Sequence, residues 1–113
     1  MLLIRKEIQW KKFIKDGKVA VLISPNYGAG WSTWAEDAHK ETLCMDARLV
    51  YLVLDGRRDE AASLAKKLIP EVYTGGAKDL TIEWVTQGQQ FEVEEYDGYE
   101  TIHVIGERGY LTA

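Results

Sequence analysis

The sequence predicts a single α/β domain of the α+β type, in which one sheet with a buried apolar strand and a C-terminal antiparallel meander carries two to three packed helices. Three observations lead to this fold class. Residues 19–24 form a continuous apolar run rich in β-branched side chains, which is typical of a strand covered on both faces. Two later segments repeat apolar residues with helical spacing. Beyond Gly75 and Gly76 the apolar period changes to two.

Length and composition limit the domain organisation and the compartment. With 113 residues, 46% of them hydrophobic and 28% charged, the chain is expected to fold around one core. A net charge of −4 argues against duplex nucleic acid as a partner. Cys44 is the only cysteine, no apolar run is long enough for a membrane span, and the N-terminal charges do not fit a secretory signal. We therefore expect a cytoplasmic protein, whose small core would gain from homo-oligomerisation.

The first elements lead into a long connection. Residues 6–15 have the pattern of a short amphipathic helix that ends at Gly17, and an edge strand over residues 1–8 is the alternative. After the central strand, residues 25–45 show no clean period, although a short helix is expected around residues 33–41. Connections of this length are often functional.

Two helices follow this connection. Residues 46–55 carry an apolar face, with Asp46 as the N-cap and Gly56 as the C-terminal stop. Residues 59–69 keep the i, i+3, i+4, i+7 spacing of apolar residues and end before Pro70.

The meander is expected to consist of strands over residues 80–85, 91–94 and 99–105. Asp97-Gly98 predicts a type I′ hairpin between the last two, and His103 is expected at the surface or at a pocket edge. Residues 106–113 are interpreted as a loosely attached tail. The acidic residues around the hairpin are interpreted as a solvated polar face that discourages aggregation: Glu92, Glu94, Glu95, Asp97 and Glu100.

The glycine-rich connection is the main candidate for a small-ligand site. Its glycines let backbone amides approach a ligand, its polar groups can form hydrogen bonds, and its tryptophans can stack on a base. It also follows a buried strand, where open α/β sheets bind ligands. Gly28-Ala29-Gly30 lacks the third glycine of GxGxxG, so the match to a nucleotide-binding motif is incomplete. The predicted ligand-binding residues are Asn26, Tyr27, Gly28, Ala29, Gly30, Trp31, Ser32, Thr33, Trp34, Arg57, Arg58 and Lys78.

Other interpretations of these residues stay open. Trp31 and Trp34 could instead fill the core while the glycines only turn the chain. His39 with Cys44 would suggest thiol chemistry and Asp37 with His39 a metal, but neither pair has a third member at a recognisable spacing. No metal site, cofactor or catalytic residue is predicted.

Three segments carry a family resemblance: VAVLISPNYGAGWSTW (residues 19–34), YTGGAKDLTIEWV (73–85) and GQQFEVEEYDGYETI (88–102). They resemble a family of small, largely uncharacterised proteins of bacteriophages and prophages. On this resemblance, residues 19–105 are the family core, residues 1–18 an extension and residues 106–113 a tail. The resemblance implies a phage accessory protein in the host cytoplasm. Such proteins often counter host defence, and one route is to sequester cyclic or ADP-ribose-derived nucleotide signals between subunits.

Three functions are considered on this basis. The first is a non-enzymatic, oligomeric sponge for a small phosphorylated or nucleotide-like ligand, with Trp31 or Trp34 stacked on the base. The second is a protein–protein inhibitor or adaptor that docks onto a host enzyme through exposed aromatic residues and the acidic hairpin. The third is a small hydrolase or transferase that uses Ser32, His39 or Cys44.

Overall fold

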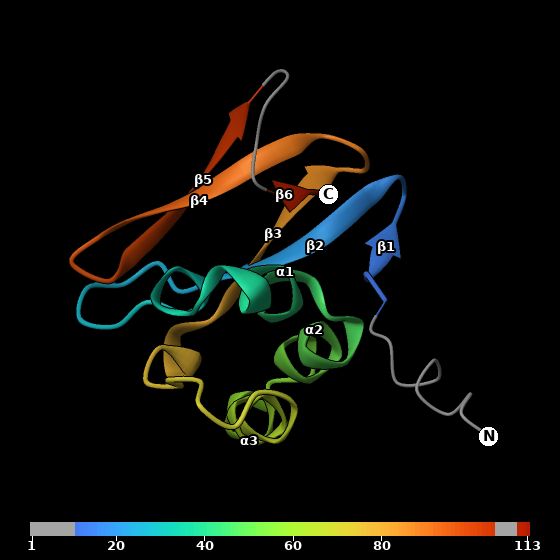
Figure 1. Ribbon diagram of the computed structural model, residues 1–113. Coiled ribbons are helices and arrows are strands. Elements are labelled where there is room, and N and C mark those ends of the chain that lie inside the picture. Colours follow the sequence, from blue (N-terminus) through green and yellow to red (C-terminus); the bar gives the residue numbers. More distant parts are fainter. Residues whose placement is uncertain (1–10, 106–110) are drawn as a thin grey trace.

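The computed structural model describes residues 11–105 and 111–113, which fold into an α+β domain. This confirms the predicted fold class. Helices α2 and α3 lie on one side of strands β2 and β3, and the β4–β5 hairpin lies on the other (Figure 1). The elements in chain order are β1 (Ile14–Lys15), β2 (Lys18–Ile23), the 3-10 helix η2 (Ser32–Trp34), α1 (Asp37–Met45), α2 (Ala47–Leu54), α3 (Arg58–Leu68), the 3-10 helix η3 (Ala77–Asp79), β3 (Thr81–Thr86), β4 (Gln90–Tyr96), β5 (Tyr99–Ile105) and β6 (Leu111–Thr112).

The strands form two sheets, whereas the sequence predicted one. One antiparallel sheet has the order β1-β2-β3 and the other has the order β5-β4-β6. The chain leaves the first sheet just after β3: Gln87 still donates its backbone N–H to the carbonyl of Gly17 in the turn before β2, whereas Gly88 donates to the carbonyl of Ala113, which follows β6 of the second sheet. Alternation of apolar residues predicts strands, but it does not specify which strands pair.

Strand β2 is the central strand of its sheet and is buried on both faces, as predicted. It pairs with β1 on one edge and with β3 on the other. Because successive side chains of a strand point to opposite faces, β2 contributes to two cores. Ala20 and Leu22 pack with α2 and α3, while Val19, Val21 and Ile23 pack with the end of α1 and with Phe91 of β4.

The helices begin and end close to the predicted residues. The buried Asp46 caps α2, since its carboxylate accepts the backbone N–H of Arg48 at 2.8 Å, and Gly56 follows the helix with φ of 77°. Helix α3 ends before Pro70. Helix α1 has the length of the helix expected around residues 33–41 but begins four residues later, at Asp37, and the 3-10 helix η2 occupies the first part of the expected range. None of the helices in the described part of the chain has the length and apolar character that a membrane crossing needs.

The β4–β5 hairpin has the predicted type I′ turn. Asp97 and Gly98 both have positive φ, 53° and 87°, and Tyr96 pairs with Tyr99 on either side of them. His103 is exposed on β5, as expected.

Two predictions at the ends of the chain were wrong where the structure describes them. Residues 11–15 are not helical: Ile14–Lys15 is strand β1, because Asp16 and Gly17 both have positive φ and turn the chain back into β2. Residues 111–113 are not a loose tail, since β6 pairs with β4 and Leu111 and Ala113 are buried. The rest of the predicted N-terminal helix, the alternative strand over residues 1–8 and residues 106–110 of the tail lie outside the described residues.

Candidate functional site

The connection from β2 to α1 runs beside the tip of the β4–β5 hairpin (Figure 1). Gly28 donates its backbone N–H to the carbonyl of Asp97 at 2.8 Å. Two glycines of neighbouring segments allow this close approach. A Cβ on Gly98 would meet the backbone nitrogen of Ala29 at 2.5 Å, and a Cβ on Gly76 would meet the carbonyl oxygen of Gly30 at 2.5 Å. The connection is therefore held between the hairpin and the segment before η3.

Glu100 organises this connection from inside the fold. Its carboxylate is fully buried and accepts the backbone N–H groups of Ser24 at 2.9 Å, Trp31 at 2.6 Å and Thr33 at 3.1 Å. The hydroxyl of Thr33 donates a fourth hydrogen bond at 2.6 Å. Loops that bind phosphate use the same arrangement, in which several backbone N–H groups surround one anion. Here the anion is a side chain of the protein itself.

The prediction that the acidic residues of the hairpin form a solvated face is therefore wrong for Glu100. It is confirmed for Glu94, Glu95 and Asp97, which are exposed. The sequence contains one signal that could have indicated this. Glu95 and Glu100 face each other across the hairpin, and directly opposed like charges are destabilising when both are solvated on one face. The donors that receive Glu100 lie far away in the sequence and could not be identified.

The two tryptophans of the connection have different environments. Trp31 is fully buried in the core, and its indole Nε1 donates to the carbonyl of Leu43 at 2.8 Å. Trp34 is 44% exposed, and its ring centroid lies 5.3 Å from that of Tyr73. The core interpretation is thus confirmed for Trp31 alone, and of these two tryptophans only Trp34 is exposed to solvent.

Trp34 belongs to a group of exposed aromatic side chains that we call the aromatic surface. Tyr27 is 65% exposed and contacts Tyr99, with ring centroids 5.0 Å apart. Tyr96, 72% exposed, is the cross-strand partner of Tyr99 and so projects on the same side of the hairpin. The aromatic surface comprises the exposed Tyr27, Trp34, Tyr73 and Tyr96 together with the half-buried Tyr99. It follows the connection from the hairpin tip to the segment after α3.

A cleft of about 660 Å³ opens on another side of the connection. Of the predicted ligand-binding residues, Ser32 and Thr33 line it. The charged lining residues are Asp37, Lys40, Glu41 and Glu92, and the Lys40 ammonium forms an ion pair with Asp37 at 3.2 Å. The cleft is therefore mainly acidic, which disfavours a phosphorylated ligand.

The predicted basic residues do not line this cleft. Arg57 is exposed and pairs with Glu60, which raises the pKa of its guanidinium and lowers the pKa of the Glu60 carboxyl. Arg58 donates its Nε to the carbonyl of Leu80 at 2.9 Å, and Lys78 is exposed in η3. Of the remaining predicted residues, Asn26 and Gly28 are exposed, Ala29 is half-buried and Gly30 is buried.

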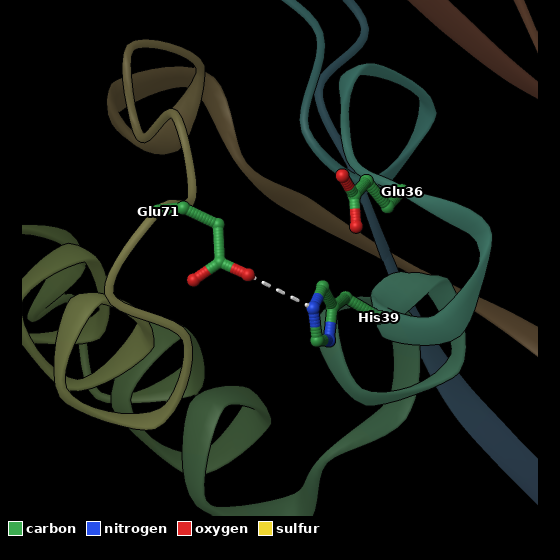
Figure 2. A group of neighbouring side chains, drawn as sticks. All are labelled: Glu36, His39 and Glu71. Atoms are coloured by element: carbon green, nitrogen blue, oxygen red, sulfur yellow. Dashed lines mark hydrogen bonds and ion pairs between the residues drawn. The ribbon is translucent and has the colours of Figure 1, made fainter.

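The considered thiol and metal pairs are not formed as the sequence suggested. Cys44 is fully buried, donates its thiol to Ser32 Oγ at 3.1 Å, and burial raises the pKa of the thiol to about 12. This environment favours an inert thiol. Asp37 pairs with Lys40, and the neighbours of His39 are Glu36 and Glu71 (Figure 2). No sequence signal linked Glu71 to His39, since they come from different segments.

Comparison with known proteins gives no relative from which to infer a role: no protein-family model, no curated protein and no solved structure matches the chain.

Proposed function

We propose that the protein is a non-enzymatic binding protein that docks onto a partner protein through its aromatic surface. The observation that carries this proposal is the exposure of Tyr27, Trp34, Tyr73 and Tyr96, which lie between 44% and 72% exposed around one connection. Tyrosine and tryptophan are enriched at interface hot spots, where each combines a large apolar area with a polar group.

The fixed backbone beneath these rings supports a docking role. The hydrogen bonds to Glu100 and the close approach of Gly76 and Gly98 restrain the connection before any partner arrives. Binding then orders few additional groups, so less conformational entropy is lost on association.

The same contacts weigh against the capture of a phosphorylated ligand by the connection. The N–H groups of Trp31 and Thr33 and the hydroxyl of Thr33 already donate to Glu100, and the N–H of Gly28 donates to Asp97. A phosphate would have to displace a buried carboxylate to use most of them.

Alanine variants of the aromatic surface test the docking proposal. The tagged chain is used for capture from a lysate of a bacterial host, and the affinity of the purified partner is then measured. Trp34→Ala and Tyr96→Ala should each weaken this affinity by roughly 30-fold, which corresponds to a hot-spot loss of about 2 kcal/mol. Tyr51→Ala is the matched control, because Tyr51 is a 56% exposed tyrosine on α2. Equal affinities for all three variants would remove the proposal.

Small-ligand binding remains a second candidate because of the cleft beside Ser32 and Thr33. Its volume of about 660 Å³ lies within the usual range of ligand pockets. Its acidic lining fits a neutral or cationic polar molecule better than a nucleotide. A panel of nucleotide second messengers and of polar amines, each at saturating concentration, tests it by the melting temperature, which a ligand of the folded state raises. No shift with any compound would remove this candidate.

The phage origin, the action in a host cytoplasm and the homo-oligomer stay predictions from the sequence. Light scattering of the purified chain at several concentrations tests the homo-oligomer directly: a mass of one chain at all concentrations would contradict it.

A further inference from the structure

Glu36, His39 and Glu71 form a compact group of metal-ligating side chains. One ligand atom from each residue lies within 4.8 Å of the others, and His39 Nε2 is 3.2 Å from Glu71 Oε2. The three side chains point into a common space between the start of α1 and the segment that follows α3 (Figure 2).

The backbone that carries these residues is positioned by contacts outside the group. Glu36 is the N-cap of α1, and its carbonyl accepts the backbone N–H of His39 at 2.9 Å. The segment of Glu71 is anchored by the buried side chain of Val72. The contact between the rings of Trp34 and Tyr73 joins the same two segments. The side chains therefore converge because the fold brings their segments together.

The charges in this group favour a cation. Within residues 11–105 and 111–113, no lysine or arginine forms an ion pair with Glu36 or Glu71, and nearby Lys40 is paired with Asp37. With a neutral imidazole the group carries two uncompensated negative charges. A divalent cation would neutralise both.

The donor set indicates the class of cation. One imidazole nitrogen with two carboxylate oxygens suits Zn²⁺ and related first-row divalent ions, whereas Mg²⁺ and Ca²⁺ prefer oxygen ligands alone. Bonds of about 2.0–2.2 Å to a tetrahedral ion place two ligand atoms about 3.4 Å apart. His39 and Glu71 already have nearly this separation, and the exposed Glu36, whose ligand atom lies within 4.8 Å of the other two, has to move by at most about 1.4 Å to complete the set.

We propose that Glu36, His39 and Glu71 bind one divalent transition-metal ion of the Zn²⁺ class, with at least one coordination position left to water. The metal-site proposal does not rest on the proposed docking function, because Glu36, His39 and Glu71 are not part of the aromatic surface and metal binding is tested on the isolated protein. The ion would connect the start of α1 to the segment after α3, next to the Trp34–Tyr73 pair.

Calorimetric titration of the full chain with Zn²⁺ is the first test. One ion should bind per chain, and His39→Ala and Glu71→Gln should each weaken binding at least about tenfold. The matched controls are His103→Ala and Glu94→Gln, which replace an exposed histidine and an exposed glutamate of the C-terminal sheet and should leave binding unchanged. The proposal would be overturned if His39→Ala and His103→Ala weakened Zn²⁺ binding equally. It would also be overturned if Glu71→Gln bound Zn²⁺ as tightly as the unchanged chain.

Nuclear magnetic resonance with Co²⁺ provides a second measurement. The chain has two histidines, so the imidazole signals of His39 and His103 can be assigned with the two alanine variants. Co²⁺ should shift or broaden the His39 signals at concentrations that leave those of His103 unaffected. Equal effects on both rings, or no effect at millimolar Co²⁺, would overturn the proposal. So would Mg²⁺ competing with Co²⁺ at equal concentration.

Discussion

Replacing Glu100 by glutamine would test whether the buried carboxylate holds the connection between β2 and α1. The substitution keeps the size of the side chain but changes one acceptor oxygen into an NH₂ group. Around the carboxylate, the N–H groups of Ser24, Trp31 and Thr33 and the hydroxyl of Thr33 are all donors. The NH₂ group of glutamine must therefore face at least one donor.

The expected loss of stability follows from these contacts. If the glutamine oxygen takes the place of Oε2, three hydrogen bonds remain but become bonds to a neutral acceptor, which weakens each by about 1 kcal/mol. The NH₂ group then opposes the N–H of Ser24, and an unpaired buried donor costs about 1–3 kcal/mol. Removing a buried charge relieves part of its desolvation cost. We expect the free energy of unfolding to fall by about 3–5 kcal/mol, a large share of the stability of a typical domain.

Urea denaturation followed by tryptophan fluorescence measures this loss. Glu94→Gln is the control, since Glu94 is an exposed glutamate of the same hairpin and should change stability by less than about 0.5 kcal/mol. The amide protons of Trp31 and Thr33 should also exchange faster in Glu100→Gln. A loss below about 1 kcal/mol with unchanged exchange would refute the assigned role of the carboxylate.

Three further predictions concern the surrounding structure. Gly98→Ala should lower the free energy of unfolding by about 2–4 kcal/mol in urea denaturation, because the new Cβ would meet the backbone of Ala29. Gly88→Ala is the control: φ is also positive at Gly88 but the space around it is open, so this variant should lose only about 1–2 kcal/mol. Equal losses in the two variants would contradict the close approach of Gly98 to Ala29. Asp46→Ala should lower the free energy of unfolding by about 1–3 kcal/mol, since it removes the cap of α2 and leaves Arg48 without its carboxylate; an unchanged melting curve would contradict this. Burial raises the pKa of Cys44 from 9.0 to about 12, so the folded state keeps the thiol proton above pH 9 while the unfolded state releases it. The contribution of the buried neutral thiol to the free energy of unfolding is therefore complete below about pH 9 and is lost as the pH rises towards 12. In Cys44→Ala, the free energy of unfolding should therefore fall less steeply between about pH 9 and about pH 12. Iodoacetamide should label Cys44 of the native chain at about pH 8 only as fast as the chain unfolds, and rapid labelling would contradict the burial of the thiol.

Elements that depend on neighbouring residues were predictable from the sequence. Apolar residues without alternation identified β2 as a strand buried on both faces, Asp97-Gly98 specified the turn of the hairpin, and Asp46 identified the start of α2. Each of these signals acts over a few residues, through backbone conformation or a local hydrogen bond. The position of the glycine-rich connection after β2 was predictable for the same reason.

The contacts of that connection were decided by the tertiary structure. Glu100 reaches Ser24, Trp31 and Thr33 across separations of 76, 69 and 67 residues, and no periodicity or motif links them. Burial of Trp31 and exposure of Trp34 likewise depend on which segments pack over the loop. His39 and Glu71 are 32 residues apart and meet because α1 and the segment after α3 are packed side by side. The sequence alone therefore determined the local conformations, whereas the pairing of distant polar groups required the packed chain, since only packing brings them within hydrogen-bonding distance.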